Sequence, residues 1–456
     1  MEFKDYFKNK KITMLGLGLL GRGVNVGKFL AENGAQLTIT DLKTKEQLKS
    51  SLKKLKKFKN ITYVLGEHRL KDFRNRDMII KAAGVPLDSS FIKEAQKNKI
   101  PIEMDASLFM RLAPRGVTIV GITGTRGKTT VTNLIYEILK CAGKRVFLGG
   151  NIRGIATLPL LKKVKPGDVV VLELDSWQLQ GFGDAKLSPH VSVFTNFMRD
   201  HMNYYRGDMD QYFNDKTNIF KYQKKGDTLV LGKQIALEIM THNNPKPRFG
   251  NFGNLQSKAR LWIVGRSSVP ISWKVKILGI HNRENVALAM RACQALGVDE
   301  KAIKQGVENF KGVPGRLEFV RVVRGVKYYN DTTATTPDGN RVALAALSGK
   351  KRNIILIAGG NDKELIFDEM ARNINRTVKA LALIKGTATD KIVKLLPKKT
   401  KYPMAVVGNM KDAIRFTHVH ARRGDTVLLS PGAASFGIFK NEYDRGDQFN
   451  KLVSKL

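Results

Sequence analysis

The chain has 456 residues, of which 42% are hydrophobic and 26% are charged, as is usual for soluble globular proteins. At roughly 150 residues per domain, this length predicts about three domains. The composition excludes a largely disordered chain, a collagen-like repeat and a disulfide scaffold. No run approaches the roughly 18 apolar residues of a membrane span, and the first residues lack the apolar core of a signal peptide. We therefore expect a cytoplasmic protein without a transmembrane segment.

The chain contains two cysteines, Cys141 and Cys293. Two cysteines cannot cross-link three domains with disulfides, which favours a protein of a reducing compartment. Both lie in apolar stretches with helical spacing, so we interpret them as core residues rather than catalytic groups.

Positive charge is in large excess, because 79 lysines and arginines face 40 acidic residues, a net charge of +39. Such an excess attracts nucleic acid, phosphorylated ligands and anionic lipid surfaces. The densest stretch, residues 43–59, has Leu48, Leu52 and Leu55 at the spacing of a buried helix face and is predicted to be one solvated helix. The other lysines are spread along the chain, so the charge alone assigns no function.

Three blocks alternate short β-rich runs with helical periods, which predicts parallel sheets covered by helices. We expect them at residues 1–113, 114–312 and 313–456. The second block begins after the Pro114–Arg115–Gly116 break, and the third begins where a helix over residues 300–310 stops at two glycines and a proline.

The first block carries GLGLLG (16–21) between a predicted strand and a helix, and Asp41 ends the next strand. This arrangement fits the dinucleotide fingerprint, in which glycines let a pyrophosphate approach a helix N-terminus and an acid about 20 residues on meets a ribose. The pattern leaves three interpretations open. The ligand is NAD, or another nucleotide binds in the same crevice, or the glycines only let strand and helix pack.

The second block carries a stronger signal, TGTRGKTT (123–130), after the strand VTIVGI. A glycine-rich turn that feeds a helix N-terminus directs backbone N–H groups and the helix dipole at phosphate. Lys128 can neutralise β- and γ-phosphate oxygens, and the Thr129 hydroxyl can hold Mg²⁺. Ile122 stands where the strict P-loop pattern has glycine. The predicted helix has one apolar stripe, formed by Val131, Leu134, Ile135, Ile138 and Leu139.

Glu173 ends the apolar run VVVLE (169–173), so a parallel sheet would put its carboxylate beside the phosphate loop, where Mg²⁺ needs oxygen ligands. A structural hydrogen bond is the alternative role. His201 is one of seven histidines, and on its own it is read as a turn histidine. Lys216, on a predicted helix, is by composition one lysine among many.

Eight segments follow one another in the order found in the Mur ligases, and the chain resembles this family over nearly its whole length. They are TGTRGKTT (123–130), GGNIRG (149–154), LELDSWQLQ (172–180), DHMNYY (200–205), LGIHNRENVALA (278–289), GVPGRLE (312–318), YNDTTATTPD (329–338) and LLSPGAASFGIFKNEYDRG (428–446). The GLGLLG segment and the last segment are most similar to the members that add D-glutamate.

The resemblance implies three α/β domains: a Rossmann-like N-terminal domain that binds UDP rather than NAD, a central P-loop-type ATPase domain and a Rossmann-like C-terminal ligase domain. It implies ATP-dependent addition of D-glutamate to UDP-N-acetylmuramoyl-L-alanine through an acyl phosphate, in cytoplasmic peptidoglycan precursor synthesis. Two Mg²⁺ sites are implied as well. We expect a monomer that binds no nucleic acid.

Residue by residue, the resemblance implies four groups of site residues. Lys128, Glu173, His201 and Lys216 would be catalytic. Thr129 and Glu173 would hold the first Mg²⁺, and His201 with a carbamylated Lys216 the second. ATP would meet Gly124, Thr125, Arg126, Gly127, Lys128, Thr129, Thr130, His281, Asn282, Asn285, Arg316 and Asp331. The UDP-sugar would meet Leu19, Leu20, Asp41, Gly84 and Asn151, and the incoming glutamate would meet Thr335, Lys363 and Ser435.

Some positions depart from the family pattern. Thr332 and Thr333 follow Asp331 where many D-glutamate-adding members have Ser-Lys, and Glu442 stands where an aromatic residue is common. A ligase of the same superfamily with another substrate pair, such as a folylpolyglutamate synthase or a Mur ligase that adds a different amino acid, therefore stays an alternative. A nucleic-acid-binding ATPase, suggested by the charge, is the third hypothesis.

Overall fold

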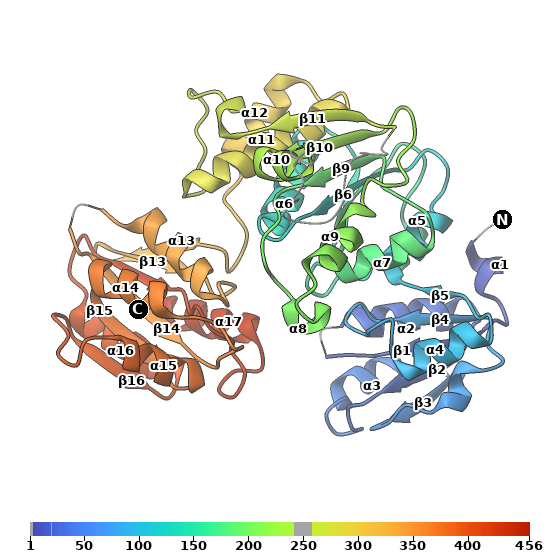
Figure 1. Cartoon of the computed structure of the whole chain (residues 1–456), viewed down its shortest axis with the longest axis horizontal. Helices are drawn as coiled ribbons and strands as arrows, with labels where there is room; N and C mark the ends of the chain where they lie inside the picture. The colour runs from blue at the N-terminus through green and yellow to red at the C-terminus, as the bar shows by residue number, and fades with distance from the viewer. Residues whose placement is uncertain (1–2, 20, 241–257, 350) are drawn as a thin grey trace. The chain divides into compact units, whose positions relative to one another are not determined.

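The computed structural model describes residues 3–19, 21–240, 258–349 and 351–456. The chain separates into two compact units, unit 1 with residues 1–274 and 283–309 and unit 2 with residues 275–282 and 310–456. Unit 1 contains two sheets and unit 2 contains a third (Figure 1). The predicted α/β class is confirmed, whereas the exact domain boundaries stay predictions. Within the described residues, no helix is long and apolar enough to cross a membrane.

The first sheet of unit 1 has five parallel strands in the order β3-β2-β1-β4-β5. The strands are β1 (Lys11–Leu15), β2 (Gln36–Asp41), β3 (Ile61–Leu65), β4 (Met78–Lys81) and β5 (Ile102–Glu103), and the helices between and around them are α1 (Phe3–Phe7), α2 (Arg22–Glu32), α3 (Lys49–Leu55), α4 (Ser90–Lys97) and α5 (Asp105–Leu112). The strand order reverses between β1 and β4. A crevice at the carboxyl ends of the strands is expected at such a point, and the glycine turn begins there.

The second sheet of unit 1 has six parallel strands in the order β11-β10-β9-β6-β8-β7. Its strands are β6 (Thr118–Thr123), β7 (Val146–Gly150), β8 (Val169–Glu173), β9 (Val191–Phe194), β10 (Thr228–Gly232) and β11 (Arg260–Val264). Its helices are α6 (Lys128–Cys141), α7 (Ser176–Asp184), α8 (Met202–Tyr205), α9 (Met209–Thr217), α10 (Lys233–Met240), α11 (Ile280–Ala295) and α12 (Glu300–Asn309). The chain runs from the middle strand β6 directly into the phosphate loop and α6.

Helix α6 confirms the apolar stripe predicted from the sequence, because all five stripe residues are buried in it. Cys293 is fully buried in α11, as expected of a core residue. Cys141 is only partly buried, since it is the last residue of α6. The core interpretation is therefore wrong for Cys141.

The basic segment over residues 43–59 is not one helix, because only α3 (Lys49–Leu55) is helical. A turn precedes α3, in which the Thr44 N–H donates to Gln47 Oε1 at 2.9 Å and the Gln47 N–H donates to the Thr44 hydroxyl at 3.4 Å. These reciprocal bonds have the pattern of a capping box, which marks the start of a helix, yet α3 begins only at Lys49. The predicted buried face holds in part, with Leu48 and Leu55 fully buried.

Unit 2 is built on a six-stranded sheet with the order β12-β13-β17-β14-β15-β16. Strand β12 (Glu318–Val323) pairs antiparallel with β13 (Val326–Asn330), and the other pairs are parallel. The remaining strands are β14 (Ile354–Gly359), β15 (Val378–Ile384), β16 (Met404–Val407) and β17 (Thr426–Leu429), and the helices are α13 (Pro337–Leu347), α14 (Asp368–Thr377), α15 (Thr387–Leu395), α16 (Met410–His420) and α17 (Glu442–Val453).

Arg445 of α17 is fully buried in unit 2. Its guanidinium donates to the Thr332 carbonyl at 2.8 Å, the Thr332 hydroxyl at 3.2 Å and the Ala433 carbonyl at 3.2 Å. Burial lowers the pKa of Arg445 to about 10, and the Glu442 carboxylate opposes this shift. One side chain therefore joins the loops that follow β13 and β17.

We predict that Arg445→Met destabilises unit 2, because the loop acceptors lose their donors inside the protein. Leaving buried polar groups unpaired costs about 1–3 kcal/mol. Urea unfolding followed by circular dichroism should show the loss, and Arg321→Met is the matched control, since Arg321 makes one exposed bond to the Ser454 carbonyl at 3.0 Å. Equal unfolding midpoints for the two variants would contradict the prediction.

Candidate active site

The segment TGTRGKTT (residues 123–130), called the phosphate loop here, begins at the end of β6 and needs glycine at two positions. Gly124 has φ +142°, and a Cβ there would lie 1.9 Å from the Thr195 hydroxyl. Gly127 has φ +83° and precedes α6, and a Cβ there would lie 2.4 Å from the Asn285 side-chain oxygen. Both positions combine a left-handed backbone with a close neighbour, so only glycine fits without strain. This loop is the turn at a helix N-terminus that the sequence predicts.

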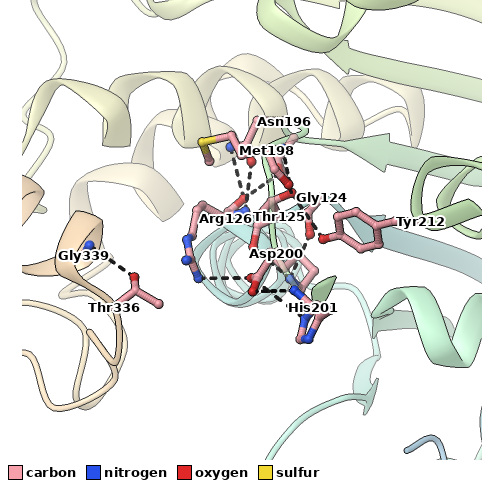
Figure 2. A network of polar contacts seen from close by, with 12 residues as sticks. Gly124, Thr125, Arg126, Asn196, Met198, Asp200, His201, Tyr212, Thr336 and Gly339 are labelled. Atoms are coloured by element: carbon pink, nitrogen blue, oxygen red, sulfur yellow. Dashed lines mark hydrogen bonds and ion pairs between the residues drawn. The ribbon is translucent and has the colours of Figure 1, made fainter. Parts of the chain in front are cut away.

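Side chains from the loop after β9 hold the phosphate loop in shape (Figure 2). The Arg126 N–H donates to Asn196 Oδ1 at 2.9 Å. The Arg126 carbonyl accepts from the Thr195 hydroxyl at 2.5 Å and from Asn196 Nδ2 at 3.2 Å. The Thr125 hydroxyl accepts from the Met198 N–H at 2.9 Å. These contacts fix the backbone of the loop before any ligand binds.

Lys128 lies at the start of α6, and its ammonium group donates to the carbonyls of Gly124 at 2.8 Å and Thr125 at 3.2 Å. The side chain therefore curls over the phosphate loop from which its own helix begins. Thr129 and Thr130 follow in the first turn of α6, where backbone N–H groups point out of the helix. The three residues therefore lie at a helix N-terminus, where the sequence predicts phosphate.

Glu173 lies next to this loop, because β6 pairs with β8 in a register that sets Ile122 opposite Glu173. The residue is 4% exposed, and its carbonyl accepts from the Asn151 N–H at 2.6 Å. The carboxyl edge of the second sheet thus joins Glu173, the phosphate loop and Asn151. The predicted neighbourhood of loop and carboxylate is confirmed by the strand register.

His201 lies just before α8 in a left-handed conformation with φ +57°. Its imidazole packs on Trp177 of α7, with the ring centroids 4.7 Å apart. Burial lowers the pKa of His201, and Lys128 and Lys216 lower it further against the opposing charge of Asp200. A neutral imidazole is the form that ligates metals.

Asp200 forms the acidic part of this neighbourhood. Its carboxylate lies 3.6 Å from Arg126 Nη1 and 3.9 Å from His201 Nε2. Burial opposes its ionisation, but the charges of His201 and Arg126 hold the pKa of Asp200 below its ordinary value. The sequence interpretation missed Asp200, although the residue lies in the segment singled out around His201.

Lys216 of α9 is 1% exposed, and its amine donates to the Gly124 carbonyl at 3.0 Å. Burial lowers the pKa of Lys216 well below its ordinary value, and the neighbouring charge of Lys128 lowers it further. The amine also lies 4.9 Å from the centroid of the Tyr212 ring. By composition Lys216 was one lysine among many, whereas the fold brings it against the phosphate loop.

The glycine turn follows β1, Asp41 is the last residue of β2 and Gly84 follows β4. These strands are parallel neighbours, so the three segments share one sheet edge. The Asp41 carboxylate accepts from the N–H groups of Leu17, Gly18 and Lys43, each at 2.9 Å. Burial opposes ionisation, but these N–H donors hold the pKa of Asp41 below its ordinary value. Asp41 therefore shapes the turn itself, a role that the dinucleotide interpretation did not foresee.

Two exposed residues complete this edge of the first sheet. Leu19 is 57% exposed, and Gly84 is exposed with open space around its Cα. Leu20 lies outside the described residues. Contact of these residues with a uridine diphosphate stays a prediction.

The ATP residues predicted in other segments divide between the units. Asn285 belongs to unit 1 and is buried beside Gly127. His281 and Asn282 belong to unit 2. His281 is exposed at the start of α11, and Asn282 Nδ2 donates to the Leu278 carbonyl at 2.6 Å.

Arg316 and Asp331 both belong to unit 2. Asp331 follows β13 and is buried, and its carboxylate accepts from the Leu317 N–H at 3.0 Å and the Ser430 hydroxyl at 2.9 Å. Arg316 is close enough for its charge to lower the pKa of Asp331. The pair therefore lies at the carboxyl edge of β13.

The three residues predicted for the incoming glutamate lie on adjacent loops of unit 2. Thr335 follows β13, Lys363 follows β14 and Ser435 follows β17, strands that are neighbours in the sheet. Backbone hydrogen bonds join these loops, from the Gly432 N–H to the Ala334 carbonyl at 2.8 Å and from the Asn361 N–H to the Ala434 carbonyl at 3.0 Å. Lys363 is exposed, whereas Ser435 is 4% exposed.

The two threonines that replace the family's Ser-Lys have structural contacts. The Thr332 hydroxyl donates to the Glu442 carbonyl at 2.6 Å, and the Thr333 hydroxyl donates to the Gly315 carbonyl at 2.9 Å. These bonds hold the loop after β13 against α17 and against the 313–316 turn. The two threonines that depart from the family pattern therefore contribute to the packing of this loop.

The donors around the phosphate loop suit Mg²⁺ by their chemistry. Among the described residues no three His, Cys, Asp or Glu side chains converge on one point. Mg²⁺ is commonly held by one or two carboxylates together with substrate phosphates and water. The buried Glu173 carboxylate and the Thr129 hydroxyl beside a phosphate-binding turn match that mode of binding.

Comparison with known protein families covers all three sheets. The MurD-like N-terminal domain of Mur ligases matches residues 10–103, the Mur ligase middle domain matches residues 122–293, and the glutamate ligase domain of Mur ligases matches residues 315–432. Among solved structures, the UDP-N-acetylmuramate–alanine ligase MurC of Thermotoga maritima has a TM-score of 0.62 at 20% identity, over 98% of this chain and 100% of that chain. The MurF ligase of Thermotoga maritima has a TM-score of 0.59 at 17% identity, over 100% of this chain and 97% of that chain. These likenesses show a shared fold.

Sequence relatives match over their full lengths. The UDP-N-acetylmuramoylalanine–D-glutamate ligase of Roseiflexus sp. is 37% identical over 98% of this chain and 99% of its own length. The protein of the same name from Borreliella burgdorferi is 36% identical over 99% of both chains. Identity at this level over nearly the whole of both chains, together with the three Mur ligase domain matches, identifies the chain as a member of the Mur ligase family.

Proposed function

We propose that this chain catalyses the ATP-dependent addition of D-glutamate to UDP-N-acetylmuramoyl-L-alanine in peptidoglycan precursor synthesis. Full-length relatives named for this reaction support the proposal. The structural observation that carries it is the meeting of Lys128, Glu173 and Lys216 at one sheet edge. We also propose a cytoplasmic monomer without nucleic acid, with domains at residues 1–113, 114–312 and 313–456.

The reaction joins a carboxylate to an amine, and a carboxylate is a poor electrophile. The terminal phosphoryl group of ATP is therefore transferred to the carboxylate of the UDP-sugar substrate. The D-glutamate amine then attacks the carbonyl carbon of the resulting acyl phosphate, so the C–N bond forms, the C–O bond to phosphate breaks and the amine loses a proton. Phosphoryl transfer depends mainly on positioning and on neutralisation of negative charge. The N–H groups of residues 124–130 and the Lys128 ammonium would supply both for the ATP phosphates.

The proposed metal ligands lie around the same loop. Thr129 and Glu173 would hold the first Mg²⁺, and His201 with a carbamylated Lys216 would hold the second. Bound Mg²⁺ supplies positive charge that lets two anionic reactants approach each other. The packing of His201 on Trp177 limits rotation of the imidazole, which supports a fixed ligand direction.

Carbamylation of Lys216 would add its amine to CO₂, with formation of an N–C bond and loss of a proton. The buried position of the amine supports this proposal, because burial favours the neutral form that reacts. The product is an anion, which would also remove the repulsion between Lys216 and Lys128.

The remaining proposed contacts follow the family resemblance. The ATP base and ribose side would meet His281, Asn282, Asn285, Arg316 and Asp331. The UDP-sugar would meet Leu19, Leu20, Asp41, Gly84 and Asn151. D-glutamate would meet Thr335, Lys363 and Ser435.

The second candidate function is a Mur-type ligase that adds a different amino acid. It is favoured by one observation, that the lysine expected after Asp331 is replaced by Thr333, whose hydroxyl bonds to Gly315. The acidic side chain of D-glutamate would then depend on Lys363 for charge.

We expect product formation when the protein is incubated with ATP, Mg²⁺, UDP-N-acetylmuramoyl-L-alanine and D-glutamate. ADP release and product mass measure the reaction, and the mixture without amino acid is the control. A panel that contains L-glutamate, a diamino acid and, in place of the UDP-sugar, folate separates the alternatives. Turnover with another amino acid but none with D-glutamate would contradict the proposed specificity.

Lys128→Ala should lower kcat by about 100- to 1,000-fold, the usual loss when one preorganised charge contact is removed. Lys140→Ala is the matched control, because Lys140 lies on the same helix and is exposed. Steady-state ADP release of both folded variants measures the effect. Wild-type turnover of Lys128→Ala would show that the phosphate-loop assignment is wrong.

Asp331 should make the stability of unit 2 dependent on pH. Burial raises its pKa from 3.8 to about 7, against the Ser430 hydroxyl, the Leu317 N–H and the Arg316 charge. A group whose pKa is higher in the folded than in the unfolded state stabilises the fold at pH values below its unfolded-state pKa. This stabilisation is lost as the pH rises through the folded-state pKa. The side chain of the Asp331→Asn variant is neutral at every pH. Between pH 4 and pH 8, the free energy of unfolding of wild type should therefore fall by up to roughly 4 kcal/mol relative to that of the variant.

Urea unfolding of wild type and Asp331→Asn at several pH values measures this difference. Comparison of the two proteins at each pH cancels the titration of the other groups. A difference in stability that stays constant from pH 4 to pH 8 would contradict the prediction.

A further inference from the structure

Arg22 connects the carboxyl edges of the two sheets in unit 1. It is the first residue of α2 and directly follows the glycine turn. Its Nη2 donates to the Asn151 side-chain oxygen at 2.9 Å, and Asn151 follows β7 of the second sheet. The family motifs quoted above do not include Arg22, and no step of the proposed reaction uses it.

The contact determines which end of the Asn151 amide is available to a ligand. An arginine side chain only donates hydrogen bonds, so it can be met only by the amide oxygen. The Nδ2 donors of Asn151 are then left for an acceptor on a ligand. The Asn151 N–H also donates to the Glu173 carbonyl at 2.6 Å, so both the backbone and the side chain of Asn151 are held.

The Arg22 charge is partly compensated within the fold, because it lowers the pKa of the buried Asp105 carboxyl, which burial raises. The N-terminus of a helix carries partial positive charge and favours acidic groups, but the first turn of α2 has no acidic residue. Arg22 Nε is buried, with no hydrogen-bond partner among the described residues. Arg22 thus keeps its Nη2 on Asn151 and, within the described part of the chain, a buried Nε without a partner beside the glycine turn, which places a donor group next to the side chain that it orients.

We propose that Arg22 is a positioning residue for the UDP-sugar substrate. It orients the Asn151 amide so that Nδ2 donates to an acceptor on the sugar or its acyl group, and it provides a fixed positive charge between the glycine turn and the catalytic edge. This inference rests on the proposed function, because it takes UDP-N-acetylmuramoyl-L-alanine as the ligand.

Arg22→Met should raise KM for UDP-N-acetylmuramoyl-L-alanine about tenfold or more, the usual effect of losing a hydrogen bond to a charged group, and should leave KM for ATP and D-glutamate within about twofold. Asn151→Asp keeps an acceptor for Arg22 but loses the Nδ2 donors, so it should raise the same KM. A double-mutant cycle with Arg22→Met and Asn151→Ala should show coupling. Arg22→Lys should restore part of the loss.

Asn25→Ala is the matched control. Asn25 lies on the same helix and donates to the Gly154 carbonyl of the same loop at 3.2 Å, so its loss removes a sheet-to-sheet contact without touching Asn151. A purely structural role of Arg22 would make the two variants alike or raise all three KM values together. Either result would overturn the inference.

Calorimetric titration of the wild-type chain with UDP-N-acetylmuramoyl-L-alanine, without ATP, separates the two proposals. If wild type binds the UDP-sugar and Arg22→Met binds it with the same affinity, the inference about Arg22 fails while the proposed function stands. If the wild-type chain does not bind the UDP-sugar, the proposed function fails and the inference fails with it. Should Arg22→Met not fold, Arg22→Lys and Asn151→Asp carry the same comparison.

Discussion

The parallel pairing of β6 with β8 and β9 is the constraint on which the catalytic edge depends. It sets Ile122 opposite Glu173 and Thr123 opposite Phe194, so the segments that follow these strands leave the sheet together. The hydrogen bonds from Thr195 and Asn196 to the Arg126 carbonyl are possible only in this register. A slip of one residue would turn every side chain of a strand to the other face and would separate the phosphate loop from its supports.

This geometry also brings two amines to one carbonyl oxygen. Lys128 and Lys216 both donate to Gly124, at 2.8 Å and 3.0 Å. Two like charges at such a distance repel, and burial makes the charged form of the enclosed amine still less favourable. Lys216 is fully enclosed, so burial lowers its pKa well below the ordinary value and the charge of Lys128 lowers it further.

The sequence predicted the elements that depend on local periodicity, and it failed where distant groups decide. The strands at 11–15, 36–41, 118–123 and 169–173 and the stripe of α6 follow from side-chain spacing. The helix predicted over residues 43–59 is shorter than expected, because α3 covers only Lys49–Leu55 and is preceded by the Thr44–Gln47 turn. The role of Asp41 was not predictable from spacing, because its partners Leu17 and Gly18 lie more than 20 residues earlier.

Unit 2 shows why a missing motif residue need not remove a site. Thr332 and Thr333 use their hydroxyls to bond Glu442 and Gly315, so that segment of the loop serves as scaffold. The loops that carry Thr335, Lys363 and Ser435 are joined by backbone hydrogen bonds, which depend little on side-chain identity. A change of side chain in one loop therefore leaves the backbone contacts of the others in place.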